Sequence, residues 1–123
     1  MATARTPIID WRDGFARRWN GGDACATHAF NALSLLFPQG EALFVDVVRD
    51  VHGRAALDSD PTLRDAVRVF VAQESIHARQ HEQYNDVLAR QGFRNVAEHW
   101  IARLQRHAWR RLSPSTRLAI VCA

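Results

Sequence analysis

The sequence PTLRDAVRVFVAQESIHARQHEQYNDVLARQ, residues 61–91, decides the fold of this chain. Asp60 stands directly before Pro61, and this pair is typical of a helix start because Asp caps the first turn and Pro suits the first helical position. Gly92 follows the stretch and is typical of the position after a helix end. The stretch therefore predicts one long helix over about residues 61–91.

One face of this predicted helix is apolar toward its ends and polar in its middle. Its positions recur with the helical period of 3.6 residues and are Leu63, Val67, Phe70, Glu74, His77, His81, Asn85 and Leu88. A carboxylate that faces a core is unfavourable unless it is paired, protonated or bound to a metal. Because two imidazoles share the face of Glu74, the pattern predicts a metal site buried in a helix bundle.

The segment before this helix supplies a second carboxylate that faces the core. We expect a helix over residues 23–36 that is rich in Ala and Leu and serves packing, a break at residues 37–40 around the proline, and a second helix over about residues 39–56. Glu41 stands at the polar end of the apolar face of that second helix. Two antiparallel helices joined by a short loop would bring Glu41 close to the polar middle of the long helix.

Glu41, Glu74 and His77 form the predicted ligand set. Glu74 and His77 are one helical turn apart, so their side chains project to the same place. One Glu from one helix and a Glu-x-x-His from the next make half of a ferritin-like carboxylate site, which needs a second Glu and a second Glu-x-x-His. Oxygen-rich ligation favours divalent iron or manganese, with zinc as the alternative. A structural polar network without a metal is the competing interpretation.

Three neighbouring polar residues extend this predicted site. His81 is expected to hydrogen-bond to the ligand His77 and orient it, although direct ligation is an alternative. Asn85 and Tyr84 either continue this polar line or make ordinary hydrogen bonds at a helix interface.

Composition limits the classes of protein that the chain fits. Its 123 residues suit one domain, and its 16 basic residues are all Arg, which gives a net charge of +3. This charge permits acidic ligands but does not predict nucleic acid as a partner. Cys25 and Cys122 are expected to be free thiols in a reducing cytoplasm. No apolar run approaches the length of a membrane span, so stable membrane insertion is not expected.

The two ends of the chain complete the predicted architecture. Residues 1–22 are expected to form an irregular arm whose three rings, Trp11, Phe15 and Trp19, pack onto the body. Asn95 is expected to cap a helix over about residues 95–111, and Pro114 to start a short last segment over residues 114–123. We therefore expect an all-α bundle of four or five helices, with residues 23–123 as the helical domain.

Three motifs together resemble one known family. They are Pro38-Gln39-Gly40-Glu41, Asp60-Pro61, and QESIHARQH at residues 73–81 with Asn85. They resemble the bacterial family described as predicted metal-dependent hydrolases, a ferritin-like helical group. The resemblance covers about residues 24–123 and implies Glu41, Glu74 and His77 as metal ligands, with His81 close by.

The resemblance extends only to the N-terminal half of such a protein, since the family chain is about twice as long. We therefore expect a fragment with an incomplete ferritin-like bundle, which holds half of a metal site and has little or no activity by itself. A symmetric pair of chains, or a site for a single metal, are the alternatives. Exposed apolar bundle faces would then favour self-association, including a homodimer.

The resemblance and the ligand set predict a metal-dependent hydrolase that acts on a small-molecule substrate of unidentified nature. A ferritin-like di-iron oxidase, or a metal or oxygen sensor or storage protein, would use the same ligands. A non-catalytic basic helical module is a further alternative, because residues 99–112 are rich in Arg. A solvated Arg face explains that segment better.

Overall fold

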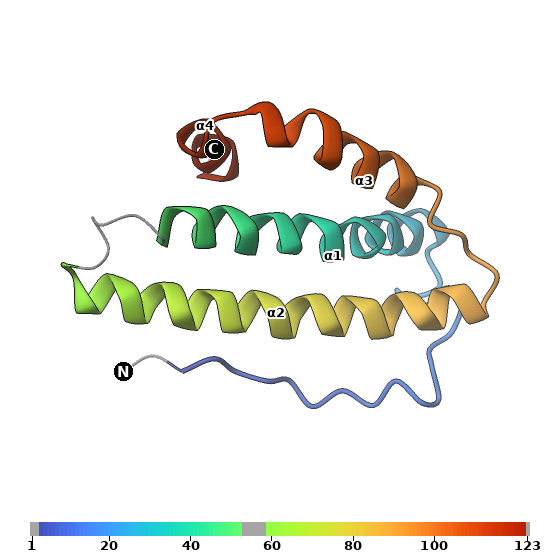
Figure 1. Cartoon of the computed structure of the whole chain (residues 1–123). Coiled ribbons are helices and arrows are strands. Elements are labelled where there is room, and N and C mark those ends of the chain that lie inside the picture. Colours follow the sequence, from blue (N-terminus) through green and yellow to red (C-terminus); the bar gives the residue numbers. More distant parts are fainter. Residues whose placement is uncertain (1–2, 53–58, 123) are drawn as a thin grey trace.

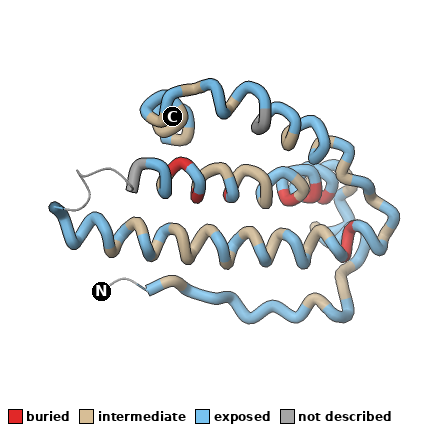
Figure 2. The backbone as a smooth tube through the Cα atoms, viewed as in Figure 1, coloured by how far each residue is buried: buried red, intermediate tan, exposed pale blue. Residues whose placement is uncertain are grey.

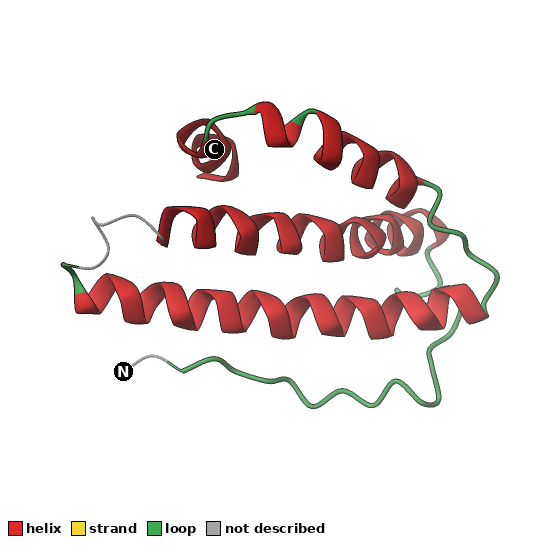
Figure 3. Cartoon of the chain, viewed as in Figure 1, coloured by secondary structure: helices red, strands yellow, loops and turns green. Residues whose placement is uncertain are grey.

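The structure, a computed structural model, describes residues 3–52 and 59–122. Its elements are α1 (Ala24–His52), α2 (Pro61–Arg90), α3 (Ala97–His107), the 3₁₀ turn η1 (Trp109–Arg111) and α4 (Pro114–Cys122). The described residues contain no strand, so the predicted all-α class is confirmed (Figure 3). In Figure 1, α1 lies between α2 on one side and α3 and α4 on the other.

The ends of α2 agree with the sequence-based prediction. Asp60 Oδ1 accepts hydrogen bonds from the backbone N–H groups of Thr62 at 2.9 Å and Leu63 at 3.1 Å, and Pro61 is the first helical residue. The helix ends at Arg90, and Gly92 follows in the left-handed region with φ of +90°. A side chain at that φ would be strained, which is why glycine terminates the helix there.

The predicted break around Pro38 is wrong, because α1 continues through this residue. Proline lacks the N–H that would bond the carbonyl four residues earlier, and its ring crowds that carbonyl. Two side chains supply donors at this point: Asn85 Nδ2 donates to the Ser34 carbonyl and Asn95 Nδ2 to the Leu35 carbonyl, both at 2.9 Å. The helix therefore changes direction along its length without ending (Figure 1). Its predicted last residues, 53–56, lie outside the described residues.

The first half of α1 is rich in Ala and Leu, but its larger apolar side chains are not the ones that are buried. Its buried side chains are polar, and with Glu41 they make up the buried polar residues of the described chain, namely Thr27, Asn31, Ser34 and Glu41. Phe30 and Leu33 are instead 52% and 47% exposed. The buried apolar residues are Val45, Val47, Val87 and Leu88, so the apolar core is confined to two short stretches. Figure 2 shows all buried residues, polar and apolar, on α1 and near the end of α2.

The predicted apolar face of α2 is buried near the C-terminal end of the helix and exposed near its N-terminal end. Leu88 is fully buried, whereas Leu63 and Phe70 are 45% and 37% exposed. An apolar helix face is buried only where neighbouring elements cover it. Among the described elements, α1 is the principal helical neighbour of α2.

The N-terminal arm packs its rings onto α2, as predicted. Tyr84 of α2 is the centre of this contact: Phe15 stacks on it with ring centroids 4.5 Å apart. Trp11 and Trp19 approach Tyr84 edge-on at 5.6 Å and 6.3 Å. Aromatic pairs in these geometries add stability beyond the apolar area they bury, so the arm is part of the folded body.

The C-terminal elements differ in detail from the prediction. The helix expected over residues 95–111 is shorter, because α3 spans Ala97–His107 and η1 follows it. Asn95 Oδ1 accepts a hydrogen bond from the Glu98 N–H at 3.1 Å, as the capping pattern predicted.

Cys25 and Cys122 are free and exposed, as expected. Among the described helices, none has the length and apolar character needed to cross a membrane.

Candidate metal centre

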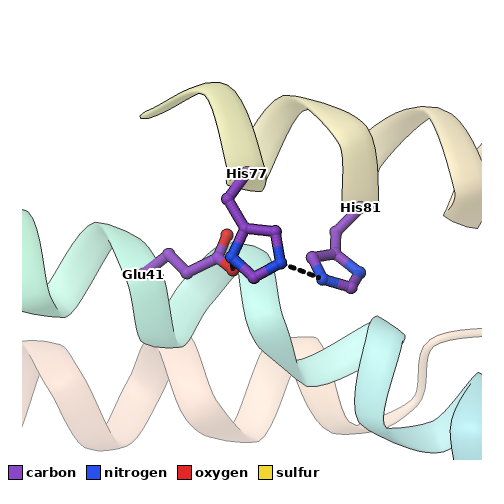
Figure 4. Close-up of side chains that lie close together, drawn as sticks. All are labelled: Glu41, His77 and His81. Atoms are coloured by element: carbon purple, nitrogen blue, oxygen red, sulfur yellow. Dashed lines mark hydrogen bonds and ion pairs between the residues drawn. The ribbon is translucent and has the colours of Figure 1, made fainter. Parts of the chain in front are cut away.

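Three potential ligands meet between α1 and α2, as Figure 4 shows. Glu41 comes from α1, three residues after Pro38, and His77 and His81 come from successive turns of α2. Each of the three offers one ligand atom, and these atoms lie within 4.8 Å of one another. The group combines one carboxylate with two imidazoles.

Glu41 is a buried acid without a proper hydrogen-bond partner. It is 3% exposed, and neither carboxylate oxygen has a hydrogen bond within the described part of the chain. Oε1 lies 2.7 Å from His77 Nδ1, a contact that lacks hydrogen-bond alignment. Burial, with the negative charges of Glu74 and Glu82, raises the pKa of Glu41 to about 7. An orphaned buried carboxylate of this kind fits a cation.

Hydrogen bonds to α1 fix which nitrogen of His81 carries the proton. The Ser34 hydroxyl donates its single proton to Asn85 Oδ1 at 2.9 Å. At 2.8 Å from His81 Nδ1, Ser34 Oγ must therefore accept a hydrogen bond from that nitrogen. This leaves a lone pair on His81 Nε2, which lies 3.0 Å from His77 Nε2 (Figure 4). Since metals bind the lone pair of a neutral imidazole, the tautomer suits ligation.

The pKa of His81 also favours the neutral imidazole. Burial lowers the pKa of His81, and the neighbouring His77 lowers it further. The ring is therefore neutral near pH 7, so its Nε2 lone pair remains available to a cation.

The structure brings together part of the predicted ligand set. Glu41 and His77 meet as expected, and His81 joins them with a ligand atom of its own. Glu74 is not a member of this group, although its charge contributes to the raised pKa of Glu41. Its role as a ligand stays a prediction.

Asn85 and Tyr84 have separate roles in the structure. Asn85 connects to His81 through Ser34, so it supports the orientation of the imidazole. Tyr84 instead donates its hydroxyl proton to Asn31 Oδ1 at 2.5 Å and has no hydrogen bond to either histidine among the described contacts. Of the two alternatives that the sequence left open, Asn85 fits a continued polar line from His81, and Tyr84 fits an ordinary hydrogen bond between helices.

Sequence reasoning missed Ser34 and Asn31. The available signal was their spacing from Glu41, because positions 31, 34 and 41 share one face of a continuous helix. The expected break at Pro38 placed Ser34 and Glu41 on different helices and concealed this relation.

The fold and the site define an all-α protein with a Glu/His/His group suited to a divalent cation. Comparison with protein families gives a match over residues 3–123 to the family described as predicted metal-dependent hydrolase. The chain belongs to this family. Comparison with curated proteins and with solved structures gives no match.

Proposed function

We propose that the protein is a metal-dependent hydrolase in which Glu41, His77 and His81 hold a divalent cation. The observation that carries the proposal is the buried Glu41 carboxylate, whose two oxygens have no hydrogen-bond partner in the described chain and which lies against an imidazole. Membership in a family of predicted metal-dependent hydrolases supports the same conclusion.

The donor set bears on the identity of the metal. One carboxylate and two imidazoles match the ligands of hydrolytic zinc sites that keep an open position. The same set also occurs in iron(II) oxygenases. We propose that Glu74, whose charge already acts on Glu41, joins as a further ligand when the cation binds. An added carboxylate would favour iron or manganese.

A bound divalent cation would supply Lewis acidity, which polarises a substrate oxygen and lowers the pKa of water. The residues of the chain prepare the site for this chemistry. Ser34 and Asn85 hold the His81 ring in one orientation and one tautomer. Glu41 has a pKa of about 7, so its carboxyl group gives up its proton near neutral pH when a cation replaces it.

A ferritin-like oxidase is the second candidate, and one observation favours it. Glu74 and Glu82 both raise the pKa of Glu41, so three carboxylates lie close enough to interact. Carboxylate-rich surroundings are typical of di-iron proteins with a bundle fold. Metal-dependent hydrolysis without consumption of dioxygen would separate the two functions.

Elemental mass spectrometry on size-exclusion fractions tests the metal site. Wild type, Glu41→Gln and the control Glu98→Gln are loaded in turn with zinc, manganese and iron(II). Glu98 is exposed in the first turn of α3 and lies outside the cluster. We expect about one cation per chain in wild type and control, and a large loss in Glu41→Gln. Equal metal in all three proteins, or none in any, would refute the proposal.

A further inference from the structure

An apolar pocket opens beside the two histidines of the candidate metal centre. Its volume is about 440 Å³, and His77 and His81 are part of its lining. This volume falls in the range of pockets that bind small molecules. The pocket is built from three segments: the N-terminal arm, the first half of α1 and the middle of α2.

Carbon dominates the pocket walls. The arm contributes Ile9 and two indoles, α1 contributes Phe30, Leu33 and Phe37, and α2 contributes Ile76. Among the residues that the structure describes, no Asp, Glu or Arg lines it. A charged ligand would therefore lose its hydration without gaining an ionic partner from these walls.

The two indole N–H groups and the Tyr84 hydroxyl of the pocket wall already donate hydrogen bonds within the protein. The Trp19 indole N–H donates to Asn31 Oδ1 at 3.1 Å, the same oxygen that accepts from Tyr84. The Trp11 indole N–H donates to Gln80 Oε1 at 3.1 Å. An apolar ligand in this pocket would therefore leave these groups satisfied, whereas a polar ligand would have to compete for them.

The arm is held in place as one wall of the pocket. The Arg5 backbone N–H donates to Gln73 Oε1 at 2.8 Å, and Gln73 Nε2 donates back to the Arg5 carbonyl at 3.2 Å. Further along, Gln91 Nε2 donates to the Phe15 carbonyl at 2.6 Å. These contacts attach the arm at Arg5 to α2 and at Phe15 to the residue that caps α2, so this wall of the pocket is held in place before a ligand binds.

We propose that this pocket binds the neutral, apolar part of a small-molecule substrate, an alkyl or aryl group, and presents its reacting polar end to His77 and His81. The inference rests on the proposed function, and it specifies the substrate class as an ester or amide with an apolar acyl or aryl group. Hydrolysis adds water across the acyl bond and yields a carboxylic acid with an alcohol or amine. The catalytic cation would act at the histidine end, and the carbon-lined walls would select the substrate.

Binding to the metal-free protein tests the pocket independently of the metal. Octan-1-ol and octane-1,8-diol are titrated in the presence of EDTA, with tryptophan emission as the signal because Trp11 and Trp19 line the pocket. We expect octan-1-ol to bind and the diol to bind about tenfold more weakly, since its second hydroxyl would be buried without a partner. Equal affinity of the two alcohols, or no binding of octan-1-ol, would overturn the proposal.

Matched leucine variants locate the binding. Leu33 lines the pocket and is 47% exposed, while Leu63 lies outside it and is 45% exposed. Leu33→Arg should weaken octan-1-ol binding by about tenfold or more, because it places a charge in the apolar wall, and Leu63→Arg should leave it unchanged. The same effect from both variants would mean that the alcohol binds elsewhere.

Metal content measured on the same samples separates the two proposals. Leu33→Arg should retain the cation that wild type binds, because Leu33 is not among the three grouped ligands. Octanol binding without metal uptake would support the pocket and refute the metal site. Metal uptake without octanol binding would refute the pocket alone.

Discussion

Glu41→Gln should make the metal-free protein more stable at pH 8, although it removes the proposed ligand. The folded state raises the pKa of this carboxyl group from its usual 4.5 to about 7. The native protein therefore holds the proton more tightly than the unfolded chain does. Below about pH 4.5 the carboxyl group is protonated in both the folded and the unfolded state, so it does not lower the free energy of unfolding. Between pH 4.5 and 7 the wild type loses stability as the pH rises.

The size of this loss follows from the shift. A change from 4.5 to about 7 corresponds to about 3 kcal/mol of unfolding free energy. Part of it comes from Glu74 and Glu82, which are partly or fully exposed to solvent and are screened by salt. We therefore expect about 2 kcal/mol at physiological ionic strength. Gln has the same shape, so any packing cost of the substitution is the same at both pH values.

Urea denaturation in EDTA at pH 4.5 and pH 8 measures this effect. Relative to wild type, Glu41→Gln should gain about 2 kcal/mol between the two pH values. Glu98→Gln, the exposed control, should differ from wild type by less than about 0.5 kcal/mol at both. An identical pH dependence in wild type and Glu41→Gln would refute the reasoning, because it would mean that the buried carboxylate is already neutralised by a partner.

A bound cation should reverse the order of stability of the wild type and Glu41→Gln. Ligand at one hundred times its dissociation constant stabilises the native state by about 2.7 kcal/mol. Wild type would receive this stabilisation and Glu41→Gln would not. A variant that is more stable when empty and less stable when loaded is the signature of a buried charge that serves binding.

Three further outcomes are expected. Metal affinity of the wild type should fall about tenfold per pH unit below pH 7, because protons compete with the metal for Glu41. Chelator competition measures this affinity, and a metal affinity that stays constant down to pH 5.5 would contradict the prediction. Asn85→Ala should cost about 1–3 kcal/mol of unfolding free energy in urea denaturation, since it leaves the Ser34 carbonyl without its side-chain donor. The substitution Gln83→Ala at an exposed neighbour should cost under about 0.5 kcal/mol, and equal losses would contradict the argument that Asn85 supports α1 where it passes Pro38. The chain should self-associate through the exposed face of α3, where Trp100 is 70% exposed. The substitution Trp100→Gln should reduce the molecular mass measured by light scattering, and a monomeric wild type at high concentration would contradict this prediction.

The ends of α2, its motif and the packing of the arm could be predicted from the sequence. Asp60-Pro61 and Gly92 act on the backbone within one turn, so local chemistry decides where the helix begins and ends. His77 and His81 share a face because the helical period places them there. The arm rings are too large and apolar to remain in solvent, which made their contact with the body predictable.

The tertiary structure decided the course of α1. Local chemistry predicts a break at Pro38, because a proline removes a donor and crowds a carbonyl. The amides that bond the carbonyls of Ser34 and Leu35 come from 51 and 60 residues further along the chain. No local pattern reveals that such distant donors will arrive, so the continuity of the helix depends on how the chain folds back on itself.

The same distinction applies to the site. The sequence placed Glu41 and His77 on helices that could meet, and it marked His81 as their neighbour. It did not reveal that Ser34 and Asn85 fix the His81 tautomer, because that link joins α1 and α2 through side chains. The apolar pocket arises from three segments separated in sequence. Helical periodicity determines which residues share a face, but only packing between elements determines which faces enclose a common space.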